Sequence, residues 1–275
     1  MGFRMLYVFS DFMYYVLYYI FRYRIKVVRE NLKLAFPEMP TDKRISIEKK
    51  YYRYLADIFL ESFKSMNISE SEMKKRYKFK NPELLEKIYK KNQNLILIAG
   101  HYCSWEWVFI LDRFTNYRVN AIYKKLSNKY FDRWAKRNRS RYNANLISTK
   151  DTFREILKNS KKSELNLYGF ASDQSPRKSN SNYWGMFLKN YVPIHTGAEI
   201  IAKKYNMAVV FMDVQKVSRG FYEVYFKTIT EKPNEYKNFE ITDKFIELLE
   251  NQIKSKPEYY TWTHKRFKHR KTLTN

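Results

Sequence analysis

The fold is decided by residues 94–107, NLILIAGHYCSWEW. Five apolar residues, 95–99, are followed at once by Gly100 and His101. A continuous apolar run of this length is typical of a parallel strand that is buried on both faces of a sheet. In open α/β sheets, ligands bind beyond the carboxyl ends of such strands. His101 is therefore predicted at a functional edge of the sheet.

Glu106 lies five residues after His101. Ser104 is predicted to cap the next helix, which places Glu106 in its first turn, where it can fold back toward the imidazole. A carboxylate that accepts from one ring nitrogen leaves the other nitrogen basic, able to deprotonate a hydroxyl that attacks a thioester. The alternative is a structural histidine. We interpret Cys103 as a small buried residue. The remaining histidines show no metal-ligand spacing to His101 and predict no metal site; they are His195, His264 and His269.

Outward from this stretch, short apolar runs alternate with longer amphipathic ones. Strands are predicted at residues 95–99, 119–123, 145–148, 165–171, 207–213 and 221–229. Helices are predicted at residues 41–66 with Thr41 or Asp42 as the cap, from 82 onward, and at 105–114, 130–139, 152–158, 197–205 and 242–254. This alternation predicts an α/β fold with helices on both faces of the sheet.

Residues 5–21 are apolar and aromatic except for Ser10 and Asp11. At ~1.5 Å per residue the segment reaches about 25 Å, short of the ~30 Å hydrocarbon core of a bilayer, and Asp11 interrupts it. We therefore expect an interfacial membrane helix within residues 1–28, ahead of a catalytic domain at 29–275. The alternative is a buried aromatic helix of the soluble fold. Basic residues after the segment favour the cytoplasmic side for the rest of the chain.

The composition indicates a polyanionic partner. The 275 residues carry a formal charge of +25, and 18% of them are aromatic. Nucleic acid, an anionic bilayer and an acidic protein would each fit this charge, and aromatic stacking on bases keeps a nucleic-acid-binding protein as an alternative. The single Cys103 excludes an intramolecular disulfide and a multi-cysteine zinc site.

Several sequence blocks, in order, resemble the lipid A biosynthesis (lauroyl and myristoyl) acyltransferases, a lysophospholipid acyltransferase-like family. The blocks are Arg29-Glu30-Asn31-Leu32 with Ala35-Phe36-Pro37-Glu38, His101 with Glu106, the basic segment 123–142, Asp173-Gln174, residues 187–193 with Thr196-Gly197, and residues 262–268. Lys189-Asn190 departs from the small residues that the family often has there.

The resemblance implies a mixed sheet of the glycerolipid acyltransferase type. It implies transfer of an acyl group from acyl carrier protein or coenzyme A to a hydroxyl of a lipid A precursor or related lipid, with His101 as base and Glu106 as its partner. A lysophospholipid, amino-lipid or glycolipid acceptor stays open. The expected partners are acyl carrier protein and anionic lipid, without nucleic acid or a cofactor beyond the thioester. The expected location is the cytoplasmic face of the inner membrane.

Four further residues are predicted to bind substrate. Arg139 and Arg141 match the family's arginines, and the planar guanidinium suits a phosphate or thioester oxygen. Asp173 and Gln174 follow a predicted strand on the same sheet edge as His101, although simple turn chemistry would also explain them. Glu199, near the start of the helix predicted at 197–205, is expected to be a dipole partner of that helix, with a second carboxylate near the site as the alternative. Solvent exposure near an anionic membrane is expected for the C-terminal basic residues, Lys265, Arg266, Lys268, Arg270 and Lys271.

Overall fold

The computed structural model describes residues 2–125, 128–177 and 181–271. Leu126 and Ser127, from the predicted basic segment, lie outside these ranges. Within them, seven strands form one mixed sheet in the order β1-β9-β8-β2-β5-β3-β4, and β6 and β7 form a separate hairpin. The strands are β1 (Tyr77–Phe79), β2 (Leu95–Ala99), β3 (Arg118–Tyr123), β4 (Asn145–Ser148), β5 (Asn166–Ala171), β6 (Trp184–Phe187), β7 (Asn190–Pro193), β8 (Ala208–Ser218) and β9 (Phe221–Thr230).

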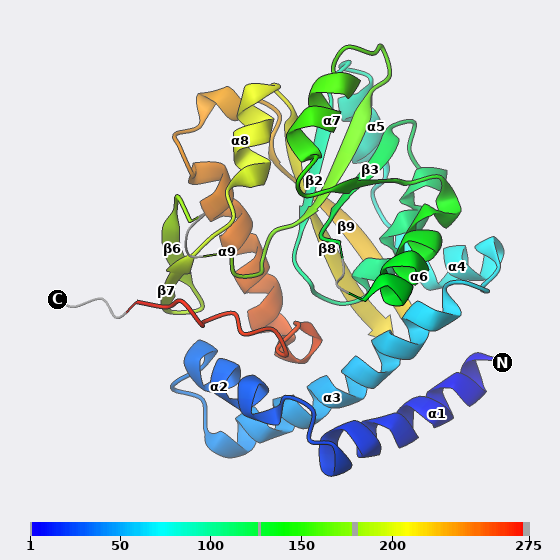
Figure 1. Ribbon diagram of the computed structural model, residues 1–275, viewed down its shortest axis with the longest axis vertical. Coiled ribbons are helices and arrows are strands. Elements are labelled where there is room, and N and C mark those ends of the chain that lie inside the picture. Colours follow the sequence, from blue (N-terminus) through cyan, green and yellow to red (C-terminus); the bar gives the residue numbers. More distant parts are fainter. Residues whose placement is uncertain (1, 126–127, 178–180, 272–275) are drawn as a thin grey trace.

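Helices flank this sheet. Figure 1 shows α8 and α9 on one side of it and α5 and α6 on the other, with α1, α2 and α3 below. The helices are α1 (Phe3–Tyr15), η1 (Val16–Ile20), α2 (Ile25–Ala35), α3 (Thr41–Lys64), α4 (Glu70–Arg76), α5 (Glu83–Tyr89), η2 (Trp105–Arg113), α6 (Lys129–Arg139), η3 (Ser140–Tyr142), α7 (Thr152–Asn159), α8 (Gly197–Lys204), η5 (Pro233–Glu235), α9 (Glu240–Ser255) and η6 (Pro257–Tyr259).

Strand β2 is the centre of the sheet, as its sequence predicts. All five of its residues are buried, so the sheet is covered on both faces there. It pairs in parallel with β5 on one side and β8 on the other, whereas β8 and β9 are antiparallel. The six predicted strands are all present. Three short strands, β1, β6 and β7, were not predicted.

Two local predictions are wrong. Ser104 occupies the N-cap position of η2, but its hydroxyl makes no capping hydrogen bond, and η2 is a 3-10 helix throughout. Helix α3 begins at Thr41 itself, so its N-cap is Pro40 and neither Thr41 nor Asp42. In both places the chain enters the helix without the side-chain oxygen that usually accepts from the first turn.

Helix α1 packs along α3. Leu6, Ser10 and Tyr14 face the protein and are buried. The opposite face is apolar and exposed, and it continues into η1 and the following turn with Met5, Val8, Phe9, Phe12, Tyr15, Tyr19, Ile20 and Phe21. Within the described residues, no helix combines the length and the apolar character needed to cross a membrane.

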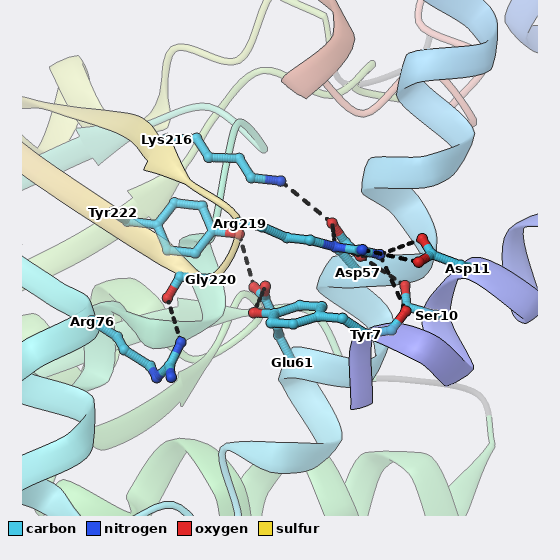
Figure 2. Close-up of polar contacts among 10 residues, drawn as sticks. All are labelled: Tyr7, Ser10, Asp11, Asp57, Glu61, Arg76, Lys216, Arg219, Gly220 and Tyr222. Atoms are coloured by element: carbon cyan, nitrogen blue, oxygen red, sulfur yellow. Dashed lines mark hydrogen bonds and ion pairs between the residues drawn. The ribbon is translucent and has the colours of Figure 1, made fainter. Parts of the chain in front are cut away.

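An ion-pair network, shown in Figure 2, fixes α1 against the core. The Arg219 guanidinium, from the turn between β8 and β9, contacts Asp11 of α1 and Asp57 of α3 at 2.7 and 2.6 Å. Ser10 donates to the same Asp57 carboxylate at 2.7 Å. Deeper in the contact, the Glu61 carboxylate accepts from the hydroxyls of Tyr7 and Tyr222. Polar side chains thus join α1, α3 and the β8–β9 hairpin.

Candidate active site

The sheet register brings His101 and Asp173 together. Ala99 of β2 is paired with Ala171 of β5, and the ladder continues with the Ser172 amide donating to the Ala99 carbonyl at 3.1 Å. His101 and Asp173 each lie two residues beyond this pair. Their side chains meet, with His101 Nδ1 2.6 Å from Asp173 Oδ1. Because an ionised carboxylate only accepts, Nδ1 carries the proton and Nε2 is left basic.

Each member of this pair changes the pKa of the other. Burial alone would lower the pKa of His101, but the charge and hydrogen bond of Asp173 outweigh it, so that the pKa is raised. Burial would raise the pKa of Asp173, which is 1% exposed, but the His101 imidazole holds it below its ordinary value. The arrangement therefore favours an ionised Asp173 beside an imidazole that accepts a proton readily.

Glu106 does not take the place predicted for it. Its carboxylate forms a two-pronged ion pair with Arg139 of α6, in which Arg139 Nε donates to Oε2 at 3.1 Å and Nη2 donates to Oε1. The expected hydrogen bond from the imidazole goes to Asp173 instead. The reason is geometric: η2 carries Glu106 toward α6, while the β2–β5 register sets Asp173 directly beside His101.

An apolar cleft of about 180 Å³ is lined by Trp105, the neighbour of the His101 ring. Trp105 contacts the His101 ring edge to face at 5.4 Å and also lines the cleft, as does Glu106. The remaining lining side chains come from α3 and α6: Ile58, Phe59, Ser62, Phe63 and Trp134.

The other predicted substrate-binding residues lie differently. Arg141 donates to the carbonyls of Ser65 and Ile68 after α3, so it joins two segments of the fold. Gln174 is half-buried next to Asp173. Asp173 itself is at the predicted edge, but its contact is with the imidazole. Sequence spacing could not show this, because the two residues are 72 positions apart and only strand pairing joins them.

The comparison with known families supports the resemblance described in the sequence analysis. The model of the bacterial lipid A biosynthesis acyltransferases matches residues 1–269 of the chain. The chain belongs to this family. It is therefore an acyltransferase, and His101 lies in the block by which the sequence resembles the family.

Curated relatives of this acyltransferase are distant but cover most of its length. A lipid A biosynthesis palmitoleoyltransferase of Escherichia coli is 24% identical over 90% of the chain and 79% of its own length. A lipid A biosynthesis acyltransferase of Haemophilus influenzae is 23% identical over 90% and 78%. A lipid A biosynthesis lauroyltransferase of E. coli is 22% identical over 90% and 80%. Each match therefore covers most of both chains.

Other predicted residues of the acyltransferase have structural roles. Glu199 is buried and accepts from the amides of Phe239 and Thr242, so its carboxylate stabilises the start of α9 rather than that of its own helix. Cys103 is fully buried, as predicted, and burial raises the pKa of its thiol. Among the residues that the structure describes, no cluster of three or more potential metal ligands is found.

One prediction for the C-terminal basic residues is wrong. Lys265, Lys268, Arg270 and Lys271 are exposed, but Arg266 is buried, with 1% of its surface exposed. Its Nη1 donates to the Pro193 carbonyl at 3.2 Å, and its guanidinium lies 4.8 Å from the centre of the Phe187 ring. The chain turns through this segment and buries the consecutive residues Arg266 and Phe267, so packing rather than charge decides which of its basic side chains are buried.

Proposed function

We propose that this protein transfers a fatty acyl chain from a thioester, on acyl carrier protein or coenzyme A, to a hydroxyl of a lipid A precursor. The observation that carries the proposal is the His101–Asp173 pair at the carboxyl ends of β2 and β5, in a chain whose family is lipid A acyltransferases. The names of the relatives support the acceptor class. Either thioester supplies the same carbonyl to the reaction.

In this proposal His101 acts as the general base. Its Nε2 accepts the proton of the acceptor hydroxyl as the oxygen attacks the thioester carbonyl, while Asp173 holds Nδ1–H and stabilises the imidazolium. Collapse of the tetrahedral intermediate breaks the carbon–sulfur bond. The imidazolium then returns its proton to the departing thiolate, so that an ester and a free thiol are formed and no proton is lost.

Glu106 is proposed to act through Arg139. Both side chains are mostly buried, at 11% and 22% exposed, and the ion pair holds the guanidinium against Glu106, which lines the cleft. Negative charge develops on the thioester oxygen during attack, and a fixed arginine is a suitable donor to it. The cleft between α3, η2 and α6 is proposed to bind the acyl chain, since its lining is mainly apolar.

The exposed apolar face of α1 and η1 is proposed to lie on the cytoplasmic face of the inner membrane. Aromatic side chains dominate this face, and such rings settle at the lipid–water boundary. The charge of +25 supports attraction to anionic lipid headgroups and to an acidic carrier protein.

The test is an acyl-transfer assay with a radiolabelled donor and a panel of lipid acceptors, run with acyl carrier protein and with coenzyme A as carriers. His101→Ala is expected to lower kcat by at least ~10²-fold, the contribution usual for a general base. His269→Ala removes a histidine near the C-terminal basic residues and is expected to keep wild-type activity. Equal transfer by His101→Ala and the wild type would refute the mechanism, and the labelled product identifies carrier and acceptor.

A further inference from the structure

Residues 259–266, near the C-terminus, form hydrogen bonds with the segment that carries His101 and with the segment that carries Asp173. We call these residues the strap. On the His101 side, the Cys103 amide donates to the Tyr259 carbonyl at 3.1 Å. The Thr261 amide and hydroxyl both donate to the His101 carbonyl, at 3.1 and 2.8 Å. The backbone of the proposed base is thus held by the strap.

On the other side, the strap holds the segment that carries Asp173. The Ser175 amide donates to His264 Nε2 at 3.1 Å, and the Ser175 hydroxyl donates to the Arg266 carbonyl at 2.5 Å. Burial lowers the pKa of His264 to about 4, which keeps its ring neutral and able to accept. One continuous piece of chain therefore sets the positions of both the imidazole and the carboxylate.

The middle of the strap is bonded to side chains of α2 and α3. Asn31 Nδ2 donates to the carbonyls of Trp262 and His264, each at 2.7 Å. The Tyr51 hydroxyl donates to Thr263 Oγ1 at 3.0 Å and accepts from the Thr263 amide at 3.2 Å. Asn31 and Tyr51 are 3% and 1% exposed. Buried carbonyls need such partners, because an unpaired one retains its full desolvation cost.

We propose that Asn31 is a positioning residue for acyl transfer, acting on the His101–Asp173 pair through the strap. The expected loss of kcat rests on the proposed function, whereas the expected change in the contact between His101 and Asp173 does not. Without the Asn31 amide, the Trp262 carbonyl loses its donor and the His264 carbonyl keeps only the Arg266 amide, so the strap shifts toward other partners. His101 and Asp173 are bonded to different ends of the strap, so their separation changes with it. Displacements near 1 Å cost about 10²-fold in rate.

The experiment compares Asn31→Ala with Asn81→Ala. Asn81 is a matched control: its side chain also makes two backbone hydrogen bonds, with the Phe226 carbonyl and amide of β9, at 2.9 and 2.8 Å. We measure kcat, KM and unfolding temperature, and titrate His101 by NMR on histidine-labelled protein, assigning its signal with His101→Ala. The charged groups near His101 are Asp173, Glu106 and Arg139, with His264 beyond them, and all remain in both variants.

Asn31→Ala is expected to lower kcat at least ~10-fold with little change in KM, and to lower the pKa of His101 as its bond to Asp173 weakens. Asn81→Ala is expected to lose stability while kcat and the His101 titration stay at wild-type values. Should Asn31→Ala fail to fold, Tyr51→Phe removes the bonds to Thr263 more gently and must move the His101 titration in the same direction.

An unchanged His101 titration in Asn31→Ala, or equal kinetic losses in the two asparagine variants, would overturn the proposal and leave Asn31 as a stabilising residue only. The NMR titration needs no substrate. If the wild type transferred no acyl group but Asn31→Ala still moved the His101 titration, the proposed reaction would fail while the positioning role would stand.

Discussion

His101 and Asp173 hold equivalent places on neighbouring strands, each two residues past the paired alanines Ala99 and Ala171. This equivalence makes the pair a property of strand register. A shift of β5 by one residue would turn Asp173 to the other face of the sheet. The contact between His101 and Asp173 therefore persists as long as β2 and β5 stay paired in this register. The chemistry of the site thus depends on β2, a buried strand that carries no polar side chain.

Asp173→Asn tests this contact at the level of one residue. The asparagine cannot stabilise an imidazolium, and the raised pKa of His101 should fall toward the value that burial favours. His101 is active as a base only when neutral, so wild-type kcat/KM should rise with pH through a limb above 6.5, and the variant's limb should move to lower pH. Its plateau should be ~10²- to 10⁴-fold lower.

The control for this change is Asp243→Asn, which removes a carboxylate on α9 that accepts from the Tyr183 hydroxyl. Its pH–rate profile should match that of the wild type. A limb that stayed in place in Asp173→Asn would show that another group sets the ionisation of His101.

At the scale of elements, the contact of α1 with α3 and the β8–β9 hairpin contains a buried acid. Burial, opposed by the hydrogen bond from Tyr222, raises the pKa of Glu61 to about 7. Tyr7 of α1 donates to the same carboxylate, so the ionisation of Glu61 is linked to the docking of α1. Around it lie Asp57, Lys216 and Arg219, whose charges offset one another.

Glu61→Gln should therefore change how stability depends on pH. Between pH 4.5 and about 7 the unfolded chain ionises at this position while the folded protein stays protonated, so rising pH destabilises the wild type. The pKa of Glu61 is raised from 4.5 to about 7. At about 1.4 kcal/mol per pKa unit, this rise corresponds to ~3 kcal/mol in the free energy of unfolding. Urea unfolding across this range should show the variant gaining that amount relative to the wild type.

The surface substitution Glu83→Gln on α5 is the control for the loss of one carboxylate. A difference between Glu61→Gln and the wild type that stayed constant with pH would contradict the assignment of Glu61.

Strands were predicted better than the site because apolar runs are local signals. The predicted bounds of β2 and β4 match the structure, whereas the missed strands β1, β6 and β7 contain Lys78, Gly185 and Pro193, which break an apolar run. The partners of charged side chains were predicted less well, because they are set by tertiary packing. Glu106 was predicted beside His101 from spacing and from the family resemblance, but a 3-10 helix and the ion pair to Arg139 direct its carboxylate elsewhere. Arg266 was predicted exposed because charge suggests exposure, and only tertiary packing shows that it is buried.

At the scale of the molecule, charge and apolar surface are expected to act together at a membrane. The exposed side chains of α1 include Phe9 and Phe12, and the net charge is +25. Phe9→Ser with Phe12→Ser should weaken binding to vesicles of mixed neutral and anionic lipid about 30-fold, equivalent to roughly 2 kcal/mol for the two rings. Vesicle sedimentation measures this.

Phe153→Ser, which removes an exposed ring from α7, is the control and should leave vesicle binding unchanged. Added salt should weaken binding of the wild type and of the double variant by a similar factor, because it screens the headgroup attraction but not the apolar contact. Wild-type binding by the double variant would place the membrane contact on another surface.

The strap also has a consequence for how the protein is made. The Asn31 amide meets carbonyls that lie 231 and 233 positions later in the chain. During synthesis, α2 leaves the ribosome long before its partners exist, and contacts of such separation form late in folding. A nascent chain could therefore complete its sheet while His101 and Asp173 still lack their support, so catalytic competence should follow the burial of the core rather than accompany it.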